Sequence, residues 1–202
     1  MVVNNDYFKL TNYLEKEWVP FHKDNAPLLY PEHLRNEIDK LNETIFHDIN
    51  NGVYKCGFAQ SQDAYEEAYE TLFARLDEFE ERLSTNRFLL GEYITDSDVR
   101  LYATLVRFDV AYYNKFNTNR QLISQYKHLW GYARDLYQTP GFGDTTDFDA
   151  IKKHYHTSIT IDPTNTSVKI LPKGPNLSGW NSEHHRHVLS NQSDKFLRKM
   201  EV

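Results

Sequence analysis

The single cysteine of the chain, Cys56, is the first residue whose chemistry could serve a reaction. A thiol becomes a nucleophile when a nearby cation or a helix N-terminus favours the thiolate. Lys55 is adjacent, but the side chains of neighbouring residues usually diverge, so we favour an unreactive free thiol over a nucleophile. One cysteine also excludes an internal disulfide, and the sequence gives no sign of secretion.

Histidines form two groups that raise the question of a metal site. A His-x-His pair can chelate from an extended strand, but a structural zinc site usually needs four ligands on a fixed framework. Neither group shows such a framework, so we predict solvated polar residues and no metal site. The groups are Glu183, His184, His185 and His187 near the C-terminus, and His154 with His156 further upstream.

The overall composition limits the function classes. The chain has 202 residues, of which 26% are charged, and a net charge of −6, whereas a nucleic-acid surface needs a basic stripe. No apolar run reaches the length that spans a membrane, and no signal-peptide pattern opens the sequence. We therefore expect a cytoplasmic protein that binds neither nucleic acid nor membrane. Its 14 tyrosines suit cores, interfaces or binding sites.

The clearest structural signal is a helix start at Thr95. As N-cap, Thr95 can accept from the backbone N–H of Asp98, while the Asp98 carboxylate reaches back to the Thr95 N–H. The following residues are nearly all apolar through several turns, which predicts a buried central helix. Arg100 and Arg107 interrupt it at one-face spacing and need partners, and Asp109 is a candidate for one of them.

Other segments show the apolar period that indicates amphipathic helices. No stretch alternates like a strand, so the predicted fold class is an all-α helical bundle. Residues 53–60 are expected to form a short aromatic loop, with Gly52 as C-cap of the helix before it. Beyond residue 157 the chain is rich in proline and glycine, which predicts a long irregular tail that wraps the domain or is disordered. The predicted helices cover about 6–18, 31–50, 61–86, 95–113, 123–137 and 147–156.

Several sequence motifs resemble the glutathione transferases. Phe88-Leu-Leu-Gly91, followed by Thr95-x-x-Asp98 and a long apolar helix, resembles the capping box and buried helix of their C-terminal domain. The helix sequence from Asp98 to Asp109 is similar to that of one branch, the glutathionyl-hydroquinone reductases or xi class. The other matching pieces are Asn50-Asn-Gly-Val-Tyr-Lys-x-Gly-Phe-Ala59, Tyr137-Gln-x-Pro-Gly141, His154-Tyr155, and Ile161-x-Pro-Thr164 followed by Gly174-Pro175.

The resemblance, which covers about residues 1–180, implies a division of the chain. Residues 27–156 correspond to the helical glutathione transferase C-terminal-like domain, and residues 157–202 to the irregular tail. Residues 1–20 resemble the end of the thioredoxin-like N-terminal domain, which in this family holds glutathione and a Cys-Pro-Trp nucleophile motif.

The family's reaction reduces glutathionyl-hydroquinones with glutathione as co-substrate, and tyrosines of the helical domain bind the aromatic ring. By motif match these are Tyr54 and Tyr155, whose phenols can stack on a quinone ring and donate to its oxygen. The alternative for each is a packing role in the core. The resemblance also makes Asp6 the remnant of a glutathione-binding Glu-Ser pair, with Tyr7 in place of the serine.

The chain contains no Cys-Pro-Trp motif, so we expect it not to run the family reaction alone but to need a thioredoxin-like domain that supplies the thiol. A second copy, forming a homodimer, and an aromatic or quinone-type ligand are the other expected partners. The alternative is a stand-alone, non-catalytic helical domain for binding or dimerisation. The apolar face formed by Phe8, Tyr13, Leu14 and Trp18 should fold back on the bundle or pair with a second subunit.

Overall fold

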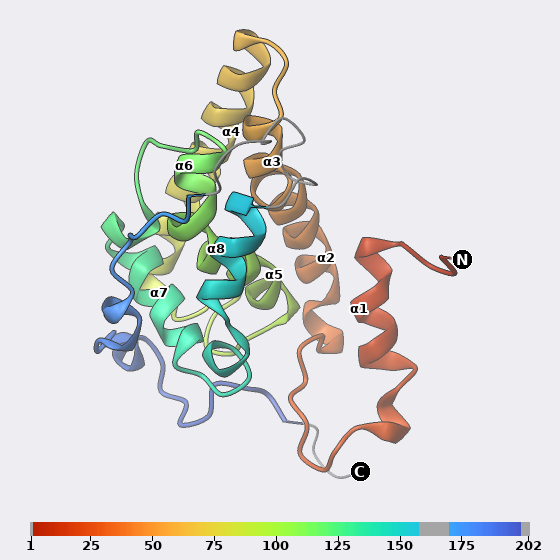
Figure 1. Ribbon diagram of the computed structural model, residues 1–202. Coiled ribbons are helices and arrows are strands. Elements are labelled where there is room, and N and C mark those ends of the chain that lie inside the picture. Colours follow the sequence, from red (N-terminus) through yellow and green to blue (C-terminus); the bar gives the residue numbers. More distant parts are fainter. Residues whose placement is uncertain (1, 158–169, 199–202) are drawn as a thin grey trace.

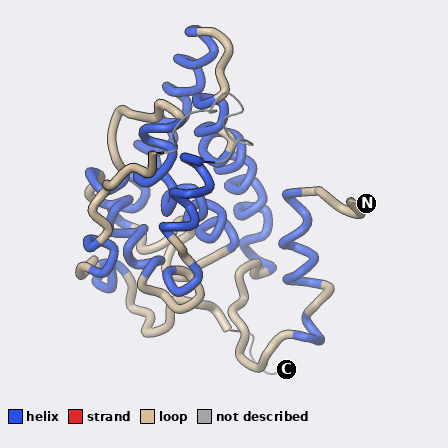
Figure 2. Tube along the Cα trace, viewed as in Figure 1, coloured by secondary structure: helices blue, strands red, loops and turns tan. Residues whose placement is uncertain are grey.

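The computed structural model describes residues 2–157 and 170–198, and these residues form a helical bundle without a strand (Figures 1 and 2). The helical fold expected from the apolar periodicity is confirmed over this part of the chain. None of its helices is long and apolar enough to cross a membrane. The helices are α1 (Tyr7–Lys16), α2 (Arg35–Thr44), α3 (Gly52–Gly57), α4 (Gln62–Thr85), α5 (Asp96–Arg107), α6 (Tyr113–Lys115), α7 (His128–Tyr137) and α8 (Phe148–Thr157).

The bundle is packed around α5. Helices α2 and α7 contact α5, and α4 contacts α3 and α7. Leu101 and Leu105 of α5 have no exposed surface, and the same holds for Leu72 and Leu76 of α4. Burying one such side chain stabilises the fold by about 1.5–3 kcal/mol, so the apolar stripes seen in the sequence provide much of the driving force for assembly.

Two π-helical turns extend the regular helices. The turn η3 (Ile45–Asn50) continues α2, and η4 (Phe108–Tyr112) continues α5 into α6. In η3, for example, the Asn51 N–H donates to the Phe46 carbonyl at 2.8 Å, a bond that spans five residues. A π turn inserts one extra residue into a helix while its backbone groups stay hydrogen-bonded.

The expectation of a loop at residues 53–60 with Gly52 as a C-cap is wrong. The chain stays helical through η3 and α3, and Gly52 is the first residue of α3 rather than a left-handed cap. Gly52 lies against α4, where an added Cβ would be 3.5 Å from Leu72 Cδ1. A side chain is tolerated less at Gly57, because a Cβ there would clash with the Phe116 ring at 2.5 Å.

The predicted cap at the start of α5 is present and fully buried. The Asp98 carboxylate accepts from the Thr95 N–H at 2.8 Å and from the Thr95 hydroxyl at 2.9 Å. It also accepts from the Leu89 N–H at 3.0 Å and from the Tyr132 hydroxyl at 2.8 Å. One side chain therefore joins the start of α5 to the preceding loop and to α7.

The partners of the two helix arginines differ from the expectation. Arg100 pairs with Asp96 one turn earlier, with 2.8 Å between Nε and Oδ2. Arg107 donates to the Ala103 carbonyl. Asp109 pairs with neither arginine, because its two oxygens accept backbone N–H groups at the start of the short turn before α7.

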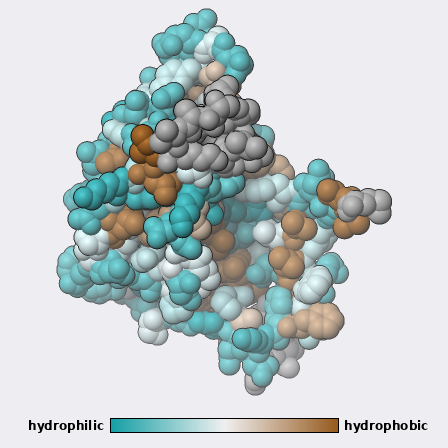
Figure 3. Space-filling view, in the orientation of Figure 1, coloured by the Kyte–Doolittle hydropathy of each residue, from teal (hydrophilic) through white to brown (hydrophobic). Residues whose placement is uncertain are grey.

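Helix α1 lies at the edge of the bundle (Figure 1), and most of its half-buried side chains are polar. The Arg100 guanidinium donates to the Thr11 hydroxyl at 2.6 Å, and the Phe8 ring packs on Phe46 with centroids 5.0 Å apart. Of the four apolar residues expected to be covered, only Phe8 folds back on the bundle. Hydrophobic side chains lie exposed along α1 and just after it (Figure 3), among them Tyr13 (41%) and Leu14 (51%) in the helix and Trp18 (56%) beyond it.

The C-terminal segment, residues 170–198, runs over the surface of the bundle back towards the N-terminal region (Figure 1). Asp135 of α7 has no exposed surface and pairs with Arg87 (Nε–Oδ2 2.9 Å) and with Lys195 of the tail (Nζ–Oδ1 2.7 Å). Arg186 of the tail is 4% exposed and donates to backbone carbonyls in the last turn of α4 and just beyond it. These buried cations attach the tail to the helical core.

Replacing Asp98 tests the cap. We expect Asp98→Asn to lower the free energy of unfolding by about 2–4 kcal/mol, because an amide offers one acceptor oxygen to four buried donors. Urea denaturation followed by circular dichroism measures the change. Asp63→Asn, in the exposed first turn of α4, is the control and should cost less than about 1 kcal/mol. Equal losses in the two variants would contradict the role of Asp98.

The ion pairs of Asp135 with Arg87 and Lys195, which we call the tail cluster, predict that acid lowers the stability of the fold. Burial acts to raise the pKa of Asp135, but the hydrogen bonds from Arg87 and Lys195 outweigh it and hold that pKa below its usual value. The stability that the ionised form provides is therefore present above about pH 3.9, the ordinary aspartate pKa, and is lost as the pH falls below it. We expect Asp135→Asn to lower stability at pH 7 by about 3–5 kcal/mol and to show a smaller further loss at pH 3 than the unaltered chain.

Urea unfolding at the two pH values provides this measurement. Lys195→Met, which leaves Arg87 on the carboxylate, is a milder variant for the same comparison. An identical pH dependence in all three proteins would rule out the cluster as the acid-sensitive element.

Candidate functional site

The two tyrosines selected by motif lie side by side. Tyr54 belongs to α3 and Tyr155 to α8, and their hydroxyl oxygens are 2.7 Å apart although 101 residues separate them in the sequence. Tyr54 is half-buried and Tyr155 is 5% exposed. Two phenol groups from distant segments thus form one hydrogen-bonded pair among aromatic side chains.

A third hydroxyl completes what we call the tyrosine cluster (Tyr54, Tyr112 and Tyr155). The hydroxyl oxygen of Tyr112, in η4, is 2.8 Å from that of Tyr155, and Tyr112 is 3% exposed. Sequence reasoning missed Tyr112, because it follows an apolar run and has the pattern of a core residue. The available signal was its place at the end of the same helix motif that carries Asp98 to Asp109.

Proton counting limits the hydrogen bonds of the cluster to two possible donor directions, and the effect of Tyr112 on the pKa of Tyr155 favours one of them. Tyr155 lies in the middle and has one proton, so it accepts from one neighbour and donates to the other. Burial raises the pKa of Tyr155 to about 12, and the hydrogen bond with Tyr112 acts to lower it. Burial and the neighbouring hydroxyls raise the pKa of Tyr112 further. With Tyr112 donating to Tyr155 and Tyr155 to Tyr54, the proton of Tyr54 is left for a ligand.

Aromatic rings surround the tyrosine cluster. The centroid of the Phe116 ring lies 5.1 Å from that of Tyr54 and 5.9 Å from that of Tyr155. Phe58, which is 49% exposed, lies 6.0 Å from Tyr54, and the His154 ring meets Tyr155 edge-on at 5.1 Å. These rings pack on one another, and aromatic faces beside hydroxyl groups are the kinds of group that contact a flat aromatic ligand and its oxygen.

Cys56 is close to Tyr54 in sequence but has a different environment. It is 3% exposed, and burial raises the pKa of its thiol to about 11. The neighbouring Lys55 does not offset this, because its ammonium donates to the His47 carbonyl at 3.0 Å. The thiol is therefore protonated at neutral pH, which supports the interpretation as a plain free thiol.

Asp6 occupies the N-terminus of α1. Its Oδ1 accepts from the backbone N–H groups of Phe8 and Lys9, each at 3.1 Å, so it is the N-cap of that helix. The neighbouring Tyr7 hydroxyl donates to the Asn50 side chain at 3.0 Å. Its second carboxylate oxygen lies 3.5 Å from the Lys9 ammonium.

The histidine groups are dispersed. His184 Nε2 lies 3.4 Å from Asp135 Oδ1 and belongs to the tail cluster, whereas His185 Nδ1 lies 3.2 Å from the exposed Glu183. Across residues 2–157 and 170–198, no three His, Cys, Asp or Glu side chains come together as metal ligands would.

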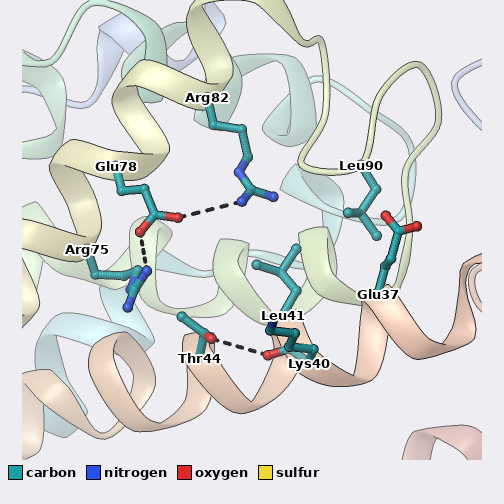
Figure 4. Close-up of a pocket in the computed structure, with 8 residues that line it drawn as sticks. All are labelled: Glu37, Lys40, Leu41, Thr44, Arg75, Glu78, Arg82 and Leu90. Atoms are coloured by element: carbon teal, nitrogen blue, oxygen red, sulfur yellow. Dashed lines mark hydrogen bonds and ion pairs between the residues drawn. The ribbon is translucent and has the colours of Figure 1, made fainter.

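A separate cavity of about 340 Å³ between α2 and α4 is lined by charges that pair with each other (Figure 4). Arg75 and Arg82 both contact Glu78, the latter at 3.6 Å, and Arg75 also holds Asp48 at 2.9 Å. The two arginines of this cavity are therefore neutralised in place, and its other charged lining residues are Lys40 and Glu37.

Comparison with known proteins identifies the family. The profile described as "Glutathione S-transferase, C-terminal domain" matches residues 62–135. A solved structure assigned to the glutathione S-transferases, from Corynebacterium glutamicum, is 48% identical with a TM-score of 0.88, over 100% of this chain and 68% of that one. The chain belongs to the glutathione transferase family.

Other family members match this glutathione transferase chain over part of their length. Glutathionyl-hydroquinone reductase YqjG of Escherichia coli is 47% identical over 136 residues, 67% of this chain and 42% of that protein. Its glutathione-bound structure is 39% identical, with a TM-score of 0.83, over 93% of this chain and 60% of that chain. The chain spans about half the length of the curated relatives it matches. The motif that starts at Ile161 lies outside the described residues.

Thiol labelling tests the environment of Cys56. We expect 5,5′-dithiobis(2-nitrobenzoate) to react with the native chain at least about 100-fold more slowly than with free glutathione at pH 7.5, because the thiol is both buried and protonated. In guanidinium chloride one thiol per chain should react at the ordinary rate. Rapid labelling of the native chain would restore Cys56 as a nucleophile.

Proposed function

We propose that this chain provides the aromatic-acceptor site of a glutathione-dependent reductase of the xi branch that acts on glutathionyl-hydroquinones. The observation that carries the proposal is the tyrosine cluster, which presents the Tyr54 hydroxyl among aromatic rings with Tyr155 and Tyr112 behind it. The similarity to YqjG, whose name states this activity, supports the choice of reaction.

In the proposed reaction a thiolate attacks the sulfur of the glutathionyl-hydroquinone. The bond between that sulfur and the ring carbon breaks, a disulfide between the thiol and glutathione forms, and the ring carbon takes up a proton. A second glutathione then regenerates the thiol and leaves as glutathione disulfide. Tyr54 orients the ring and donates to its oxygen as electron density moves onto the ring, Tyr155 donates to Tyr54, and Tyr112 holds Tyr155 in place.

The thiol in this scheme comes from a thioredoxin-like domain with a Cys-Pro-Trp motif, which also binds glutathione as co-substrate. Cys56 does not suit the role, because its thiol is buried and protonated at neutral pH. We propose that such a domain covers the exposed apolar face of α1, with Asp6 near the glutathione. The same exposed face also favours a second candidate, a non-catalytic binding or homodimerisation domain.

Menadione binding tests the acceptor site. We expect Tyr54→Phe and Tyr155→Phe each to raise the Kd for menadione by about 5–10-fold, because the first removes the donor to the ligand and the second removes the hydroxyl that orients Tyr54, each worth about 1 kcal/mol. Tyr13→Phe, on the exposed face of α1, should leave the Kd unchanged. Isothermal titration calorimetry gives all four values, and circular dichroism shows whether the variants are folded.

Equal menadione binding by all four proteins would remove the proposed role of the tyrosine cluster. Glutathione alone is the second ligand in the same experiment, and we expect no measurable binding by this chain. Clear glutathione binding would instead place a donor site on the chain itself and would make Asp6 and Cys56 the next residues to replace.

A further inference from the structure

Arg107 is a charged group that the proposed reaction leaves unused. It is the last residue of α5, and its guanidinium folds back along the helix to donate to the Ala103 carbonyl at 2.6 Å. Over residues 2–157 and 170–198, no carboxylate forms an ion pair with it, in contrast to Arg100 on the same helix.

Arg107 lines a cleft of about 380 Å³ between α5 and the segment that leads into α8. The other charged group in the cleft is Asp147, whose Oδ1 accepts the Ala150 N–H at 2.9 Å. That carboxylate therefore lies at the N-terminus of α8, where the helix dipole offsets its charge. Within the part of the chain that the structure describes, Arg107 therefore forms no ion pair with that carboxylate. The walls beside it are mainly apolar and include Val99, Ala103, Val106, Phe142 and Ile151.

The cleft adjoins the tyrosine cluster. Helix α8 contributes Ile151 to the cleft wall and, one turn later, Tyr155 to the cluster. Burial raises the pKa values of Tyr155 and Tyr102 to about 12, and in both cases the positive charge of Arg107 is among the effects that oppose the rise. The guanidinium is thus close enough to act on the cluster hydroxyl on one side and on a cleft hydroxyl on the other.

We propose that the aromatic acceptor carries an anionic substituent, a carboxylate or a similar acid group, which binds Arg107 while a ring oxygen binds the tyrosine cluster. This inference rests on the proposed function and narrows its substrate class. A planar guanidinium matches a carboxylate in geometry, and a largely apolar cleft whose arginine has no ion pair among the described residues suits an aryl acid. The arginines in the cavity of Figure 4 differ from Arg107, because Glu78 and Asp48 neutralise them.

Two hydroquinones of nearly equal size, 2,5-dihydroxybenzoate and 2,5-dihydroxybenzamide, differ in this one charge. We expect the unaltered chain to bind the benzoate about 10-fold more tightly than the benzamide in anaerobic calorimetry at pH 7.5. Arg107→Gln should reduce this preference to less than about 2-fold by weakening benzoate binding alone, and Arg107→Lys should keep part of it. Arg82→Gln, the same change in the cavity of Figure 4, is the matched control and should leave the preference intact.

The outcomes separate this inference from the proposed function. Equal binding of the two compounds by the unaltered chain, or a preference that survives Arg107→Gln, overturns the role of Arg107. The acceptor site itself still stands in that case if Tyr155→Phe weakens both compounds by a similar factor. If neither compound binds, or if Tyr155→Phe affects neither, the acceptor site is refuted and the anion preference with it.

Discussion

A buried carboxylate sets the geometry of this bundle. Asp98 lies in the core, where a charged or polar group is tolerated only if its hydrogen bonds are satisfied. Its four donors come from the start of α5, from the loop before it and from α7, so they fix where α5 begins and how it faces α7. The groups in our two proposals follow from that placement, since Arg107 ends α5 and Tyr112 lies in its continuation.

Much of this arrangement could be predicted from residue types and spacing. The Thr95 and Asp98 pair predicts the helix start, and the apolar stripes predict the inner faces of the helices. The motifs select Tyr54 and Tyr155, whose hydroxyls are in contact. These features are local, or they repeat with the period of the helix, and such signals survive in a sequence. The family and the helical fold were accessible for the same reason.

The features that escaped prediction depend on contacts between distant segments. Asp109 was near Arg107 in sequence, yet backbone N–H groups of a later turn occupy its carboxylate. Tyr112 has the pattern of a core residue until α8 brings a hydroxyl to it. Helix α1 also departs from the usual pattern, because its polar side faces the bundle and its apolar side faces solvent. Such departures from local rules are typical of surfaces and sites with a function beyond folding.

In the two π turns, the count of residues matters as well as their types. Tyr54 follows η3 and Tyr112 lies in η4, so each turn determines the direction in which a hydroxyl points. One residue more or less in a helix rotates everything after it by about 100° around the axis and moves it by about 1.5 Å along the axis. A relative could therefore keep every tyrosine and still lack the cluster if its alignment with this chain had a one-residue gap in either turn. In this family, the positions of gaps carry information about acceptor binding that a count of identical residues does not.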